Sequence, residues 1–88
     1  MTIYIPHNLK NDKLDDIAST LELILTEIQG SILSKTLNDQ AVDYYQLAID
    51  KELNKLTKIT ESSTTVEVNI LLKVIIQLLA LLITNLIK

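Results

Sequence analysis

Apolar residues recur every three or four positions along most of this chain, a spacing that places them on one face of a helix. The first such stretch predicts a helix over residues 12–36. Asn11 or Asp12 is suited to cap its start, and acidic residues in its first turn favour the positive end of the helix dipole. Gly30 weakens a helix by about 1 kcal/mol relative to Ala, so a kink or early end there is an alternative. The predicted apolar face consists of Leu14, Ile17, Ala18, Leu21, Ile24, Leu25, Ile28 and Ile32.

A second helix is predicted over residues 39–60, because Asn38-Asp39 is a typical start signal and a new apolar stripe follows it. The polar run that comes after residue 59 contains Ser and Thr residues whose side chains compete with helical hydrogen bonds. Tyr44 and Tyr45 are adjacent and point about 100° apart on a helix, so one is expected in the core and the other at its edge. The predicted core face is Val42, Tyr45, Ile49, Leu53, Leu56 and Ile59.

A third helix is predicted over residues 65–87, since Thr64 and Glu67 have the spacing of a capping box. A short strand over 64–68 is the alternative, but no second strand is apparent to pair with it. This helix is unusually apolar, with one uninterrupted apolar arc of about 160°. The residues of that arc are Leu71, Leu72, Ile75, Ile76, Leu78, Leu79, Leu82, Ile83 and Leu86.

The three helices are expected to form one all-α domain over residues 1–88, a small three-helix bundle with short loops near residue 37 and at 61–64. Residues 1–9 precede the first helix as an arm. Ile3, Tyr4 and Ile5 favour extended backbone there, and Pro6 disfavours a helix at the residue before it. We expect this arm to pack loosely.

Composition limits the chemistry available to the chain. Leu, Ile and Val supply 34 of the 88 residues, there is no Cys, Phe or Trp, and His7 is the one histidine. Disulfides, thiolate nucleophiles and zinc sites of the usual kind are therefore excluded. The first residues lack the basic and long apolar regions of a secretory signal, so a cytoplasmic protein is the default expectation. With a net charge of −3, no Arg and no Lys cluster, nucleic acid is not an expected partner.

The remaining candidate sites have simpler structural explanations. Asp12, Asp15 and Asp16 could hold a divalent cation, but acidic residues in a first helical turn are more often explained by capping and by the helix dipole. His7 has no nucleophile or carboxylate motif beside it, and Gly30 alone makes no phosphate-binding loop. We therefore predict no catalytic, cofactor-binding or metal-binding residues, and a protein that is not an enzyme.

The breadth of the apolar arc on the third helix predicts a binding role. Two helices cannot cover such a face from one side, so the nine arc residues are predicted to contact a second copy of the chain or a helical protein partner. Such a role would suit an adaptor, chaperone, regulator or immunity-type protein. The alternative is a peripheral or C-terminally anchored membrane protein that places the same helix in lipid. That alternative is less favoured, because the uncharged run over 74–87 has about 14 residues where about 20 are needed to span a bilayer.

Overall fold

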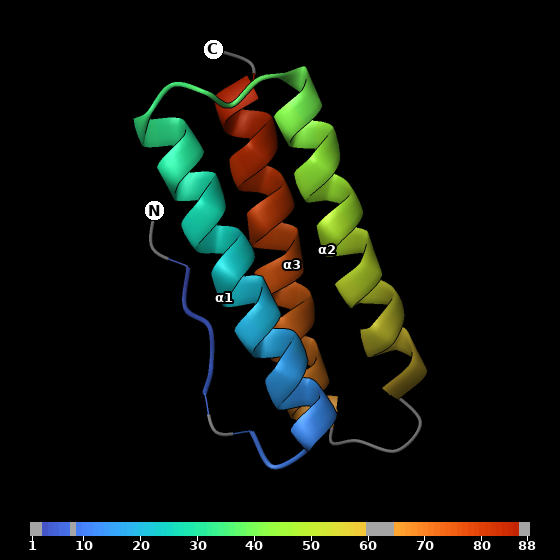
Figure 1. Cartoon of the computed structure of the whole chain (residues 1–88). Helices are drawn as coiled ribbons and strands as arrows, with labels where there is room; N and C mark the ends of the chain where they lie inside the picture. Colours follow the sequence, from blue (N-terminus) through green and yellow to red (C-terminus); the bar gives the residue numbers. More distant parts are fainter. Residues whose placement is uncertain (1–2, 8, 60–64, 87–88) are drawn as a thin grey trace.

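Three helices make up most of the chain. The computed structural model describes residues 3–7, 9–59 and 65–86. Within them it contains α1 (Asp12–Leu33), α2 (Asp39–Ile59) and α3 (Thr65–Leu86), and no strand. Figure 1 shows α1 and α3 running in one direction and α2 running in the other, with all three packed side by side. The predicted all-α three-helix bundle is confirmed.

The starts of α1 and α2 are capped by the residue types that the sequence indicated. The backbone N–H of Lys13 donates to Asn11 Oδ1 at 2.8 Å, and that of Leu14 donates to the same atom at 3.3 Å. At the start of α2, the backbone N–H of Ala41 donates to Asn38 Oδ1 at 2.9 Å. Each cap satisfies donors that have no partner inside the helix. The predicted cap of the third helix, Thr64, lies outside the described residues.

The end of α1 differs from its prediction, which placed it at residue 36. The helix continues through Gly30 and stops at Leu33, because Lys35 adopts a left-handed backbone with φ of 59°. The backbone N–H of Thr36 donates to Ser31 O at 2.9 Å, and that of Lys35 to the carbonyl of Ile32 at 3.2 Å. This pair of bonds is a Schellman motif, whose left-handed position is usually Gly. Because Lys rather than Gly occupies that position, the sequence does not indicate that the helix ends there.

Replacing Lys35 by Gly should raise the free energy of unfolding by about 1 kcal/mol, because Gly adopts the left-handed region without a Cβ penalty. Urea unfolding followed by circular dichroism measures the change. Lys35→Ala is the matched control, since it removes the same side chain but keeps the Cβ, and it should give no such gain. An equal gain in both variants would show that the backbone conformation is not the cause.

The core is aliphatic and runs the length of the bundle. The seven α1 residues from Leu14 to Ile28 on the predicted face are all buried, and Ile32 is half-buried. Tyr45 is the one aromatic residue in the core, while Tyr44 is exposed, as the spacing predicted. The Tyr45 hydroxyl lies 2.9 Å from Ser31 Oγ and donates to the carbonyl of Glu27 at 3.3 Å. These bonds join α2 to the second half of α1.

The arm packs more closely than the sequence predicted. Ile3 and Ile5 are 9% and 6% exposed and belong to the core cluster, and Pro6 is buried beside them. Figure 1 shows this segment running alongside α1. The expectation of loose packing was wrong, because alternate residues of an extended segment face one side and here that side is apolar. The backbone N–H of Lys10, the residue after the arm, also donates to Glu67 Oε2 at 3.3 Å, which joins the end of the arm to the first turn of α3.

Candidate functional site

The arc predicted on the third helix is divided by the fold into a core face and an outer face. Leu71, Leu78 and Leu82 have no exposed area, and Ile75 is 2% exposed, so these four residues belong to the core of the chain itself. Val74, which lies outside the predicted arc, is buried as well. The surface that α3 offers to a partner is therefore narrower than the nine residues predicted, and it lies to one side of the core.

Four residues of the predicted arc lie on the outer face, and we call them the α3 stripe: Leu72, Ile76, Leu79 and Ile83. Ile76 is 64% exposed and Ile83 is 51% exposed, while Leu72 and Leu79 are half-buried at the edge of the core. At 100° per residue the four positions fall within an arc of about 60°. Their spacing of four, three and four residues is that of a coiled-coil seam. The side chain of Leu86, the ninth predicted residue, lies outside the described part of the chain.

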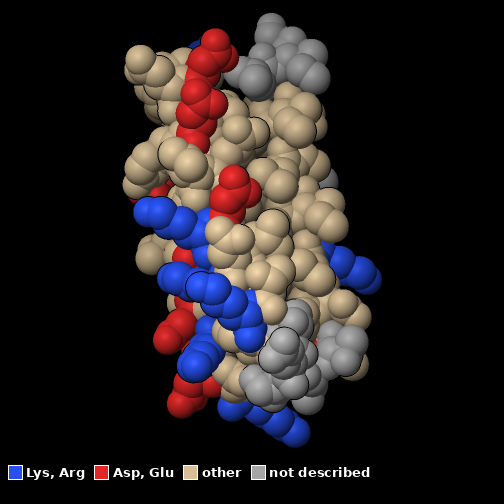
Figure 2. Space-filling view, turned by 90° about the vertical axis from the view of Figure 1, so that its right-hand side faces the viewer, with Lys and Arg blue, Asp and Glu red and all other residues tan. Residues whose placement is uncertain are grey.

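Charged residues border the α3 stripe on both sides. Tyr45 and Glu52 lie on the side of α2 that meets α1. The exposed Asp43 and Asp50 lie on the other side of α2, which is the side toward α3. Beyond the stripe, the exposed Lys73 follows on α3 itself. Figure 2 shows an uncharged expanse with acidic side chains beside its upper part and lysine side chains beside its lower part. An apolar seam between an acidic edge and a basic edge is typical of a helix-packing surface.

A second apolar patch lies between α1 and α2. Leu23, Tyr44 and Leu47 are 67%, 62% and 65% exposed and line one shallow groove. None of them lies on a predicted core stripe or in the predicted interaction set. The patch lies on the α1 side of α2, whereas the α3 stripe lies beyond the opposite flank of α2.

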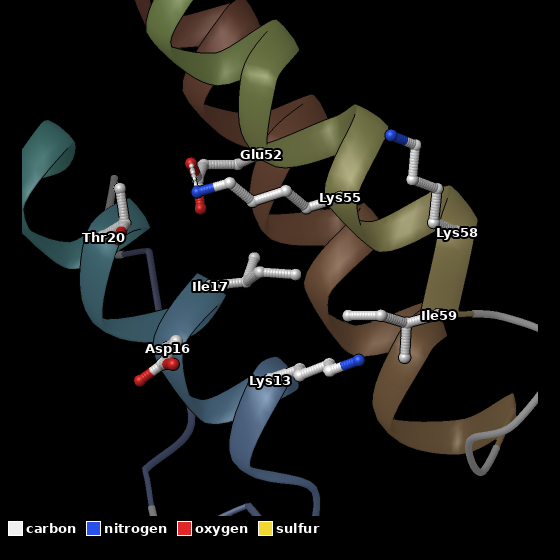
Figure 3. Close-up of a pocket in the computed structure, with 8 residues that line it drawn as sticks. All are labelled: Lys13, Asp16, Ile17, Thr20, Glu52, Lys55, Lys58 and Ile59. Carbon is white, nitrogen blue, oxygen red and sulfur yellow. Dashed lines mark hydrogen bonds and ion pairs between the residues drawn. The ribbon is translucent and has the colours of Figure 1, made fainter.

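A pocket of about 290 Å³ opens between the first half of α1 and the last half of α2. We call it the Glu52 pocket. Figure 3 shows Glu52 reaching from α2 toward Thr20 of α1, with Ile17 and Ile59 lining the middle of the pocket. Lys13 lies at the other end, while Asp16 points away. The residues that line it are Lys13, Asp16, Ile17, Thr20, Glu52, Lys55, Lys58 and Ile59.

Glu52 is the unusual residue of this pocket. It is 4% exposed, its Oε2 accepts a bond from Lys55 Nζ at 3.1 Å, and no described residue donates to its buried Oε1. A buried carboxylate oxygen without a donor is energetically costly and rare in folded proteins. The sequence held a signal that was missed, because Glu52 lies at helical spacing between Ile49 and Leu56 on the apolar stripe.

The other candidate residues do not form a site. Asp12 and Asp15 lie in the first turn of α1, and the backbone N–H of Leu9 donates to Asp15 Oδ1 at 3.3 Å. Among the described residues, no three His, Cys, Asp or Glu side chains gather closely enough to hold a metal ion. His7 Nε2 lies 3.1 Å from Glu22 Oε2, and both side chains are about half exposed. This contact, which was not predicted, links the arm to α1.

Comparison of the chain with protein-family models, with curated proteins and with solved structures gives no match. Among the described residues, the features that could contact another molecule are the α3 stripe, the apolar patch between α1 and α2, and the Glu52 pocket.

Proposed function

We propose that this chain is a non-enzymatic helical interaction protein that binds a second copy of itself through the α3 stripe. The observation that carries the proposal is the exposure of Ile76 and Ile83 beside the half-buried Leu72 and Leu79. Fully burying an aliphatic side chain of this size is worth about 1.5–3 kcal/mol, and contiguous apolar patches on soluble proteins usually mark association sites. A partner that covers the stripe buries the apolar area that folding of the single chain leaves exposed. The complex gains the corresponding part of this burial energy.

The spacing of the stripe supports a partner with the same pattern. Residues at intervals of four, three and four insert into the gaps of a neighbouring helix that has the same intervals. The α3 stripe of a second copy meets that requirement, and a two-fold axis lets both copies use one surface.

The charged borders favour one of the two possible two-fold arrangements. If the two-fold axis is parallel to α3, the Lys73 edge of each copy faces the acidic edge of the other copy. If the axis is perpendicular to α3, the acidic edges of the two copies face each other. Lys73 lies eight residues after the start of α3, and Asp50 lies nine residues before the end of α2, at the same end of the bundle. Lys73 of one copy is therefore level with Asp50 of the other in the parallel arrangement, where opposite charges attract.

The intact chain should be a dimer at about 100 μM, and replacing Ile76 and Ile83 together by Asp should make it a folded monomer. Asp at these two positions places unpaired charges in the apolar contact of the dimer, while both positions are exposed in the single chain. Light scattering coupled to size-exclusion chromatography measures the mass, and circular dichroism checks the fold.

The matched control replaces Leu23 and Leu47 by Asp, because these residues are equally exposed but lie in the groove between α1 and α2. This variant should remain a dimer. A monomeric intact chain would contradict the proposal, and so would dissociation by the control variant alone.

A cysteine placed at position 83 tests the arrangement of the two copies, since the chain has no Cys of its own. In the parallel arrangement the two copies of residue 83 lie near the axis, so Ile83→Cys should cross-link on mild oxidation. In the antiparallel arrangement residue 83 approaches position 72 of the other copy instead. Cross-linking of Ile83→Cys with Leu72→Cys in a mixed sample, without cross-linking of either variant alone, would contradict the parallel arrangement.

A membrane role is the second candidate, because Val66–Asn85 is long and apolar enough to cross a bilayer by length and composition, and only a third of it is buried. Lys73 and Glu67 lie within those 20 residues, and inserting them into lipid is costly. Insertion would also remove α3 from the core that it shares with α1 and α2. Flotation of the intact chain with vesicles of neutral and anionic lipids tests this role. Complete recovery in the lipid-free fraction would eliminate it.

A further inference from the structure

The buried carboxylate of the Glu52 pocket carries a second inference, which is independent of the α3 stripe. The pocket has its own volume of about 290 Å³, and it contains Glu52, whose side chain is only 5% exposed and has one oxygen lacking a donor among the described residues. A ligand that brings a hydrogen-bond donor to Oε1 removes a cost that the folded chain otherwise bears. The pocket therefore favours ligands with a strong donor at one end.

The other groups of the pocket define the rest of the ligand. Ile17 and Ile59 form an apolar middle, and Lys13 supplies an ammonium group at the end away from Glu52 (Figure 3). Apolar walls favour methylene groups, and an ammonium group favours a carboxylate. We infer that the pocket binds a small ω-amino acid, with its ammonium on Glu52, its methylene chain between Ile17 and Ile59, and its carboxylate on Lys13.

Lys55 controls access to the carboxylate. Glu52 Oε1 has almost no contact with solvent, whereas the Lys55 side chain is 62% exposed and forms the one ion pair that Glu52 makes among the described residues. The ammonium of the ligand takes the place of Lys55 Nζ on Oε2, since Lys55 can rotate into solvent, and its further N–H donors then reach Oε1 of the same carboxylate. Lys55 is therefore a competitor of the ligand, while Glu52 and Lys13 are its partners.

The test titrates the intact isotope-labelled chain with δ-aminovalerate and follows the backbone amide resonances. The resonances of residues 13–20 and 52–59 should shift and saturate in the millimolar range, while those of residues 72–83 should not. Valerate lacks the ammonium group, pentylamine lacks the carboxylate, and glycine lacks the methylene spacer. Each of these three should bind at least tenfold more weakly than δ-aminovalerate.

Three substitutions separate the roles of the pocket residues. Glu52→Gln and Lys13→Met should each weaken binding of δ-aminovalerate at least tenfold, whereas Lys55→Met should leave it unchanged or make it tighter. Lys35→Met is the control, because Lys35 is exposed, follows the end of α1 away from the pocket and lines neither the pocket nor the groove beside it, and it should bind normally.

The comparison among the four ligands needs no variant, so the inference stays testable if Glu52→Gln does not fold. Absence of saturable shifts up to about 20 mM δ-aminovalerate would overturn it. Equal binding of valerate or glycine would overturn it too, and so would weaker binding by Lys55→Met.

Discussion

Replacing Leu78 by Ala should lower the free energy of unfolding of the chain by about 2–5 kcal/mol. Leu78 has no exposed area and lies on the face of α3 that meets the core, so truncation leaves a cavity between the helices. An 88-residue domain has only about 5–15 kcal/mol of stability in total, so this one change removes a large share of it. Denaturant unfolding at a low protein concentration measures the loss.

The matched control for this prediction is Ile76→Ala, two residues earlier on the same helix. Ile76 is 64% exposed, so its truncation should change the stability of the single chain by no more than about 0.5 kcal/mol. The same variant should weaken the proposed dimer. If Ile76→Ala and Leu78→Ala destabilised the single chain equally, α3 would have to pack on the bundle through a different face.

Replacing Glu52 by Leu should raise the free energy of unfolding by about 1–3 kcal/mol. Leu fills a similar volume, contacts the buried neighbours Ile49 and Leu56, and removes the oxygen that no described residue satisfies. Lys55→Met should have the opposite sign and a similar size, about 1–3 kcal/mol, because it leaves both oxygens of a buried carboxylate without a donor among the described residues. Thermal and urea unfolding of both variants measure these changes.

The double variant with Leu at 52 and Met at 55 is the internal control. Once Glu52 is absent, Lys55→Met should have no further effect on stability, since the ion pair is its only described contact with Glu52. A loss of stability in Glu52→Leu would mean that the carboxylate stabilises the fold. In that case the buried carboxylate would not lower the stability of the fold, and its burial would not indicate a binding site.

The sequence predicted the parts of the fold that depend on local chemistry. The α1 face from Leu14 to Ile28 and the Asn caps of α1 and α2 are encoded by spacing and residue type, and the structure confirms them. The end of α1 was not predictable in this way. Lys35 is held in a left-handed conformation by the Schellman bonds, and a residue with no preference for that conformation gives no local signal.

Features that depend on how the helices pack were predicted least well. A broad apolar arc shows that α3 must be covered, but only the positions of α1 and α2 decide that Val74 is buried and Ile76 is exposed. Burial of Ile3 and Ile5 depends likewise on a tertiary contact of the arm. Periodicity along α2 places Glu52 on the buried face, but the pocket also needs Lys13, Ile17 and Thr20 of α1, which periodicity along one helix cannot reveal.

The position of Tyr45 decides what optical spectroscopy of this protein can report. The chain has no Trp, and Tyr4 and Tyr44 are 73% and 62% exposed, so the change in tyrosine absorbance on unfolding comes mainly from Tyr45. Because its hydroxyl bonds to Ser31 and Glu27, that signal reports the contact between α2 and the second half of α1. Far-ultraviolet circular dichroism, in contrast, measures the helical content of all three helices together. A dichroism change that precedes the tyrosine change would therefore show that helix is lost elsewhere while α2 still contacts the second half of α1.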